Sequence, residues 1–119
     1  MMKSQLEISK TEPAEGVAMI KLSGRLMLGP ESAQLETLAK DLYDNGTRKL
    51  IIDLGGVTHM DSTGIGRCIA CLNKAMQVKA QLHMASAHGQ VRDSFRVTRL
   101  DRMFKFFDTQ EAALAAFKP

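Results

Sequence analysis

One segment, from Leu50 to Gly66, limits the possible folds of this chain more than any other. It opens with Leu50–Leu54, an apolar run broken only by Asp53, and such a run is typical of a strand covered on both faces. A Gly-Gly pair at 55–56 then predicts a loop. The next motif is Asp61-Ser62-Thr63-Gly64, which leads directly into a helical pattern. The segment therefore predicts a strand, a loop and a helix that presents a serine hydroxyl to solvent on its first turn.

The residues before this segment predict a hairpin. Leu6 and Ile8 alternate with polar neighbours, which indicates a short edge strand. Val17–Ser23 indicates a second strand that pairs with the first across a turn containing Pro13 and Gly16.

A helix is predicted between Pro30 and the Asn45-Gly46 pair. Pro30 fits the first helical position, where its missing N–H costs nothing, and glycine tolerates the left-handed conformation common just after a helix. Apolar residues recur between these ends with the spacing of one helical face. They are Leu35, Leu38, Ala39 and Leu42.

The remaining residues continue the alternation of helices and strands. The helix beginning at Ser62 has its own apolar stripe, Ile65, Cys68, Ile69, Leu72 and Met76, and Met76 and Met84 are expected in the core. Further elements are a strand at Leu82 and Met84, a helix beginning with Val91 and Phe95, a short strand at Phe104 and Phe106, and a last helix capped by Asp108 or Thr109 that carries Ala113, Leu114 and Phe117. This order predicts a single α/β domain over residues 1–119, with a mixed sheet of four to five strands flanked by about four helices.

Composition argues against several classes of protein. Charged residues make up 24% of the chain and hydrophobic residues 45%, as in ordinary globular domains, and no apolar run is long enough to span a membrane. The first residues, Met1 to Glu7, contain no apolar signal-peptide core, so a cytoplasmic location is expected. Basic residues are scattered apart from a modest cluster from Arg92 to Lys105, which also holds Asp93 and Asp101, and nucleic-acid binding normally needs a denser stripe.

The thiols and imidazoles do not indicate an active site. Cys68 and Cys71 resemble a redox pair, but Cys68 lies almost two turns into the predicted helix, on its apolar stripe, where buried packing is the expected role. His59, His83 and His88 fall on three different predicted elements without the spacing of metal ligands. We therefore expect no metal, no cofactor and no enzymatic activity.

Ser62 is the residue whose chemistry is most informative. If Asp61 caps the helix, the backbone N–H groups around Ser62 lack helical partners and tolerate negative charge, so a phosphate could be added there without disrupting the fold. Plain capping by Asp-Ser-Thr is the alternative.

Gly64 and Gly66 each cost a helix about 1 kcal/mol relative to alanine, so we expect them to clear a flat approach to the hydroxyl. Close helix–strand packing could explain one of the two.

The motif Leu54-x-x-Val57-x-x-Met60-Asp61-Ser62-Thr63-Gly64-Ile65-Gly66 resembles the signature of STAS domains, in particular bacterial anti-sigma factor antagonists. The resemblance extends over roughly Leu6 to Phe117. It implies that Ser62 is phosphorylated by an anti-sigma factor that is also a serine kinase of the GHKL type, and that a PP2C-type phosphatase reverses the modification. The unphosphorylated protein would bind the anti-sigma factor and free the sigma factor. Expected partner contacts are Met27, Asp61, Thr63, Gly64, Ile65, Gly66 and Arg67.

One departure from the family pattern leaves a second function open. Many relatives have Gly-x-Leu-Asp after the second strand, whereas this chain has Gly24-Arg25-Leu26-Met27. Loss of that carboxylate is compatible with a constitutive STAS subunit of a signalling scaffold or a lipid-transport assembly. A thiol-based or phosphate-handling enzyme is the third alternative. For an anti-sigma factor antagonist, we expect a monomer or weak homodimer that contacts neither nucleic acid nor membrane.

Overall fold

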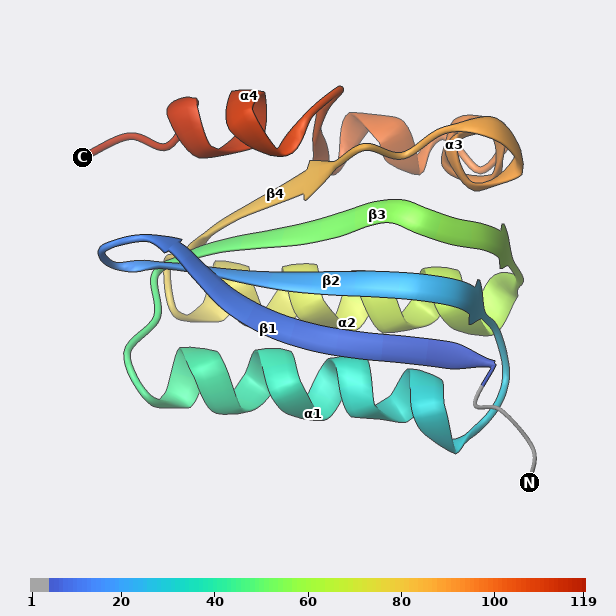
Figure 1. The fold of residues 1–119 in the computed structure, drawn as a ribbon, viewed down its shortest axis with the longest axis horizontal. Helices are drawn as coiled ribbons and strands as arrows, with labels where there is room; N and C mark the ends of the chain where they lie inside the picture. Colours follow the sequence, from blue (N-terminus) through green and yellow to red (C-terminus); the bar gives the residue numbers. More distant parts are fainter. Residues whose placement is uncertain (1–4) are drawn as a thin grey trace.

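The computed structural model describes residues 5–119, and their centre is one mixed five-stranded sheet with the order β1-β2-β3-β4-β5 (Figure 1). The strands are β1 (Leu6–Ala14), β2 (Val17–Leu26), β3 (Lys49–Met60), β4 (Gln81–Ala85) and β5 (Lys105–Phe107). β1 and β2 form the predicted antiparallel hairpin, and all later pairings are parallel. Residues 1–4 lie outside the described residues. They begin both the segment in which no signal-peptide core was expected and the domain predicted over residues 1–119.

The helices are α1 (Pro30–Asp44), α2 (Ser62–Gln77), α3 (Gly89–Val97) and α4 (Gln110–Ala115), with a short 3₁₀ helix, η1 (Leu100–Arg102), after α3. α1 and α2 run alongside each other and, with α3, cover the main core, whereas α4 lies over the other face of the sheet (Figure 1). This arrangement confirms the predicted α/β class, the strand number and the helix number.

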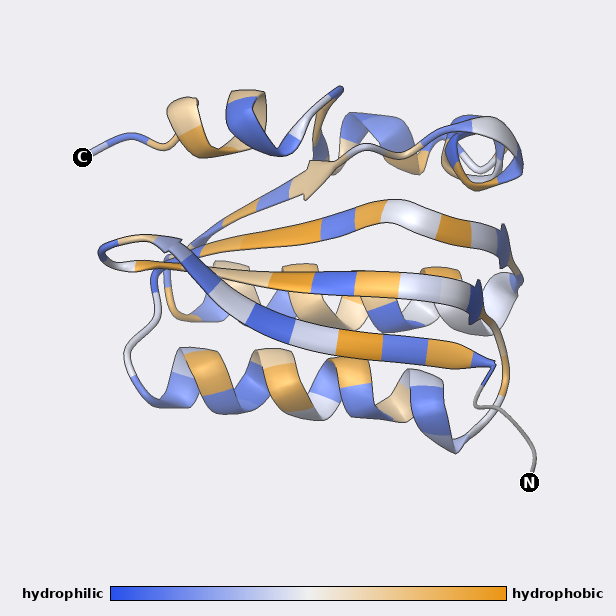
Figure 2. Cartoon of the chain, in the orientation of Figure 1, coloured by the Kyte–Doolittle hydropathy of each residue, from blue (hydrophilic) through white to orange (hydrophobic). Residues whose placement is uncertain are grey.

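The central position of β3 is confirmed, but its predicted end was wrong. Leu50–Leu54 is buried, and in Figure 2 the first part of β3 is mostly hydrophobic, while hydrophobic and hydrophilic bands alternate along α1. The Gly-Gly pair at 55–56 does not form a loop, since β3 continues to Met60. A Cβ atom on Gly56 would lie 2.9 Å from the Leu22 carbonyl oxygen, so glycine lets β2 and β3 remain paired across an irregular register.

α2 packs through a line of small residues that differs from the predicted stripe. Its buried residues are Gly64, Cys68, Cys71 and Ala75, and Ile65, Ile69 and Leu72 are only partly buried. The expected burial of Met76 was wrong, because its side chain is 66% exposed. Ala75 occupies the core-facing position on that turn, and the next residue is rotated by about 100° toward solvent.

α4 closes a second, smaller core that the sequence indicated only in part. Thr109 provides the expected cap, accepting a hydrogen bond from the Ala112 N–H at 3.0 Å. Beneath the helix, the His83 ring stacks on Phe117 with a centroid distance of 4.0 Å, and its Nδ1 lies 2.8 Å from the Ala113 carbonyl oxygen. β4 is therefore covered on both faces, although its sequence alternates like a half-exposed strand.

Candidate functional site

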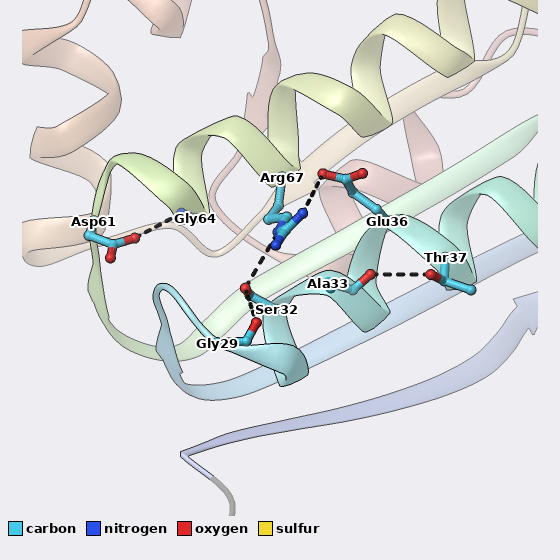
Figure 3. Close-up of polar contacts among 8 residues, drawn as sticks. All are labelled: Gly29, Ser32, Ala33, Glu36, Thr37, Asp61, Gly64 and Arg67. Carbon is cyan, nitrogen blue, oxygen red and sulfur yellow. Dashed lines mark hydrogen bonds and ion pairs between the residues drawn. The ribbon is translucent and has the colours of Figure 1, made fainter.

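Asp61 fixes the start of α2, as predicted, and also reaches a second loop. Its Oδ1 accepts a hydrogen bond from the Gly64 N–H at 2.9 Å, the capping contact drawn in Figure 3. Its Oδ2 accepts another from the Leu28 N–H at 3.1 Å, in the loop between β2 and α1. Ser62 is consequently the first residue of α2, and it is exposed.

The pKa of the Asp61 carboxyl lies below its ordinary value. Partial burial alone would raise this pKa, but the N–H groups of Gly64 and Leu28 stabilise the ionised form and outweigh that effect. The site therefore holds one fixed negative charge beside the Ser62 hydroxyl near neutral pH.

Gly64 and Gly66 have different roles. Gly64 is buried, and a Cβ atom there would lie 2.1 Å from the Leu26 carbonyl oxygen and 2.9 Å from the Met60 side chain. Gly66 is exposed, and a Cβ atom there would meet nothing within 4 Å. Close helix–strand packing thus explains Gly64, and only Gly66 leaves the surface beside Ser62 flat.

Arg67 is directed toward α1. Its Nη1 lies 3.1 Å from Glu36 Oε1 in an ion pair, and its Nε donates to Ser32 Oγ at 3.4 Å. Ser32 is buried and in turn donates to the Gly29 carbonyl oxygen at 3.0 Å, so a chain of polar contacts links α2 to the first turn of α1 (Figure 3). Neither Ser32 nor Glu36 was identified from the sequence, because both contacts join residues more than 30 positions apart.

The loop between β2 and α1 places apolar side chains beside the start of α2. Met27 is partly buried, whereas Leu28 is 78% exposed and its backbone is held by Asp61. Leu28 therefore presents an exposed apolar side chain at a fixed position beside the start of α2. The sequence did not indicate the position of Leu28, because only the fold brings residues 28 and 61 together.

A groove with a volume of about 530 Å³ lies between the start of α2 and α3. Its lining residues are Met60, Asp61, Ser62, Ile65, Gly89, Gln90, Asp93, Ser94, Val97 and Thr98. Val97 is 80% exposed at this groove, and the only charged side chains in the lining are the two carboxylates. Of the residues predicted as partner contacts, Asp61 and Ile65 share the groove with Ser62, whereas Thr63 and Met27 are partly buried nearby.

The cysteines are free and buried, as expected. Burial raises the pKa of the Cys71 thiol to about 12, and burial also raises the pKa of Cys68. Both thiols are therefore protonated at neutral pH, which makes them poor nucleophiles.

Residues 5–119 contain neither a metal-binding group nor a membrane-spanning helix. This part of the chain contains no group of three or more His, Cys, Asp or Glu side chains arranged to bind a metal ion. None of the helices in this region has the length and apolar character needed to cross a membrane.

Comparisons with known proteins agree with this architecture. The family model described as the STAS domain matches residues 9–113. BtrV of Bordetella bronchiseptica, named as an anti-sigma factor antagonist, is 27% identical over 104 residues, which cover 87% of this chain and 89% of that protein.

Two solved structures show the same fold. An anti-sigma factor antagonist from Mycobacterium paratuberculosis has a TM-score of 0.80 at 22% identity, covering 93% of this chain and 92% of that one. The Bacillus cell fate determinant SpoIIAA, solved in its phosphorylated form, has a TM-score of 0.71 at 18% identity, covering 92% and 97%.

Proposed function

This chain belongs to the STAS domain family, and from that membership we propose that it is a cytoplasmic anti-sigma factor antagonist whose docking face is centred on Ser62. The observation that carries the proposal is the exposed Ser62 hydroxyl, held by the Asp61 cap at the rim of a groove whose only charged lining residues are acidic. The resemblance to BtrV supports the general role.

The apolar residues around Ser62 supply the surface that a partner would bury. Leu28 is exposed in the loop held by Asp61, and Val97 is exposed at the groove. Gly66 has no side chain and lies in open space, so a partner protein can approach the surface closely there. Apolar residues around a small polar centre suit a protein interface, whose core is depleted of charged residues.

Phosphorylation of Ser62 would make this surface unfavourable for docking of a protein partner. Transfer of the γ-phosphoryl group of ATP to Ser62 Oγ, with loss of the hydroxyl proton and release of ADP, would add about −1.5 to −2 charges. No basic side chain lines the groove to neutralise them, and Asp61 and Asp93 are already present. A desolvated dianion without a partner at an interface costs several kcal/mol, which is enough to release the bound protein.

The partners follow from this cycle. An anti-sigma factor of the GHKL kinase type would bind the unmodified protein, releasing its sigma factor, and would phosphorylate Ser62. A PP2C-type phosphatase would hydrolyse the phosphoserine and restore the binding form. The protein itself would be a substrate and not an enzyme.

The test is to incubate the protein with ATP and each GHKL-type kinase encoded in the same genome, and to locate phosphate by mass spectrometry. We expect phosphate on Ser62. Binding of the kinase, measured by calorimetry, should fall at least about 100-fold for Ser62→Asp and stay near wild type for Ser62→Ala. Ser9→Asp, which adds the same charge to an exposed position on β1, is the matched control. Absence of phosphate with every kinase, or equal affinity for both Ser62 variants, would refute the proposal.

A constitutive STAS subunit of a scaffold or lipid-transport assembly is the second candidate function, and Met27 favours it. This partly buried side chain replaces the family's aspartate in the loop next to the α2 cap, which removes a charge from the docking face. Under this alternative, a stable complex would be isolated whose affinity is the same for wild type and Ser62→Asp.

A further inference from the structure

The formal net charge of one segment of this chain equals that of the whole chain. The segment from Arg92 to Lys105 spans most of α3, all of η1 and the first residue of β5. It holds five basic and two acidic side chains, a formal net charge of +3, and the whole chain also has a formal net charge of +3. The rest of the chain therefore has no formal net charge.

Little of this charge is neutralised. Arg96, Arg99, Arg102 and Lys105 are exposed. Among residues 5–119, the ion pair formed within this segment joins Arg96 to Asp93 at 3.6 Å, and its side chains are 66% and 64% exposed, so solvent screens it. Arg92 stacks over the Phe106 ring at 4.1 Å, and its buried Nη1 atom has no hydrogen-bond acceptor in the described structure.

Two exposed apolar side chains lie within the same segment. Val97 is 80% exposed and Met103 is 52% exposed. Single exposed apolar residues are common, but both of these are close in sequence to exposed cations. Val97 lines the groove beside Ser62, and Met103 lines a separate hollow together with Lys105. The surface therefore combines cationic and apolar contacts.

The segment is held rigidly by the residues between the exposed ones. Phe104 is buried in the main core and Leu100 packs against it. Thr98 Oγ1 donates to the Ser94 carbonyl oxygen at 2.7 Å, and the Met103 N–H donates to the Leu100 carbonyl oxygen at 2.9 Å. A rigid surface loses little conformational entropy when a partner binds.

We propose that this surface, the basic corner, docks an acidic and partly apolar segment of a protein partner. The basic corner consists of Arg96, Val97, Arg99, Arg102, Met103 and Lys105. Charge complementarity to carboxylates and the apolar pair together identify the occupant. The proposal goes beyond the Ser62 cycle and does not depend on phosphorylation.

Nucleic acid and membranes fit this surface less well. The exposed large apolar residues of the described chain include no aromatic ring on which a base could stack. Asp93 and Asp101 interrupt the basic residues, which would weaken contact with a continuous phosphate backbone. A membrane-surface helix needs a broad free apolar face, whereas Val91 and Phe95 of α3 are buried.

The test measures binding of a fluorescent helical peptide rich in Glu and Leu by anisotropy. The triple variant Arg96→Glu, Arg99→Glu, Arg102→Glu should bind at least about tenfold more weakly than wild type. The matched control is Lys10→Glu, Lys21→Glu, Lys79→Glu, which changes net charge equally at exposed positions outside the segment and should stay within about twofold. Amide shifts in NMR spectra should be confined to α3, η1 and the start of β5.

A second variant, Val97→Ser with Met103→Ser, leaves the charge unchanged and should weaken binding of the Glu–Leu peptide several-fold. Equal loss in the two charge-reversal triples, or equal binding of a peptide with Ser in place of Leu, would overturn the proposal. Tighter binding to phosphatidylglycerol vesicles or to duplex DNA than to the peptide would also overturn it and identify a lipid or nucleic-acid surface. The probe contains no kinase, so failure here leaves the Ser62 proposal intact.

Discussion

The two long helices begin differently, although each follows a strand at the same end of the sheet. α2 has a charged side-chain cap, Asp61, with a hydrogen bond to the Gly64 N–H. α1 begins after Gly29, without a side-chain cap. Asp61 holds the Leu28 N–H in the loop before α1, and Arg67 of α2 donates to Ser32 in the first turn of α1. The start of α2 therefore organises both its own first turn and the neighbouring loop.

The first way to break this arrangement is to separate α2 from the sheet. Gly64→Ala would place a methyl group 2.1 Å from the Leu26 carbonyl oxygen, so the helix or β2 must move. We expect a loss of about 2–3 kcal/mol in the free energy of unfolding, measured by urea denaturation, despite the better helix propensity of alanine. Wild-type stability in this variant would show that the contact between α2 and β2 is loose.

Removing the shared carboxylate should affect both helices at once. Asp61→Ala is expected to lower the free energy of unfolding by about 1 kcal/mol through loss of the cap. Hydrogen exchange of the Leu28 amide should accelerate along with that of Gly64, because both bonds are lost. Asp93→Ala, at an exposed position on α3, is the control and should leave both amides unchanged.

Acid should reproduce this effect in the unaltered protein. The folded pKa of Asp61 is depressed below the ordinary 3.8, so its contribution is complete above that value and is lost as the pH falls through the folded pKa. The stability difference between wild type and Asp61→Ala should therefore shrink below about pH 4. A difference that stays constant down to acid unfolding would contradict the role of the ionised cap.

Cutting only the link from Arg67 should loosen α1 while sparing α2. Arg67→Met keeps the aliphatic packing but removes the ion pair to Glu36 and the bond to Ser32. We expect a loss of about 0.5 kcal/mol, with faster hydrogen exchange in the first turn of α1 alone. Lys40→Met, which removes an exposed ion pair elsewhere on α1, should leave that turn unaffected.

The effect on stability expected at Gly66 has the opposite sign. Gly66→Ala meets no atom within 4 Å, so it should stabilise α2 by up to about 1 kcal/mol. If Gly66 belongs to the docking face, the same variant should weaken binding of the kinase partner. Stabilisation with unchanged affinity would remove Gly66 from that face.

Patterns local in sequence predicted much of this molecule. The hairpin, the central strand at Leu50–Leu54, the Asp61 cap and the burial of Cys68 all follow from spacing of a few residues. The predicted loop at Gly55-Gly56 failed because a distant segment decides the outcome, and the burial of His83 was not predicted for the same reason. Gly56 remains in a strand because β2 approaches it, and His83 is buried because α4 covers it.

The candidate site was predicted only in part for the same reason. Ser62 and its cap are adjacent in sequence, but Leu28 and Val97 reach the same surface through the fold. A single exposed apolar residue has no periodic signal, so neither side chain could be distinguished before the loops were placed.

Because the Asp61 carboxylate accepts two hydrogen bonds, few other residues could replace it at this position. Two backbone donors 33 and 3 residues away in sequence each use one oxygen of a single short side chain. An asparagine would keep one acceptor and turn an NH₂ group toward the other donor, and a serine would be too short to reach both. Even the amide isostere should therefore satisfy only one of the two donors, so the carboxylate at position 61 serves the structure as well as any recognition.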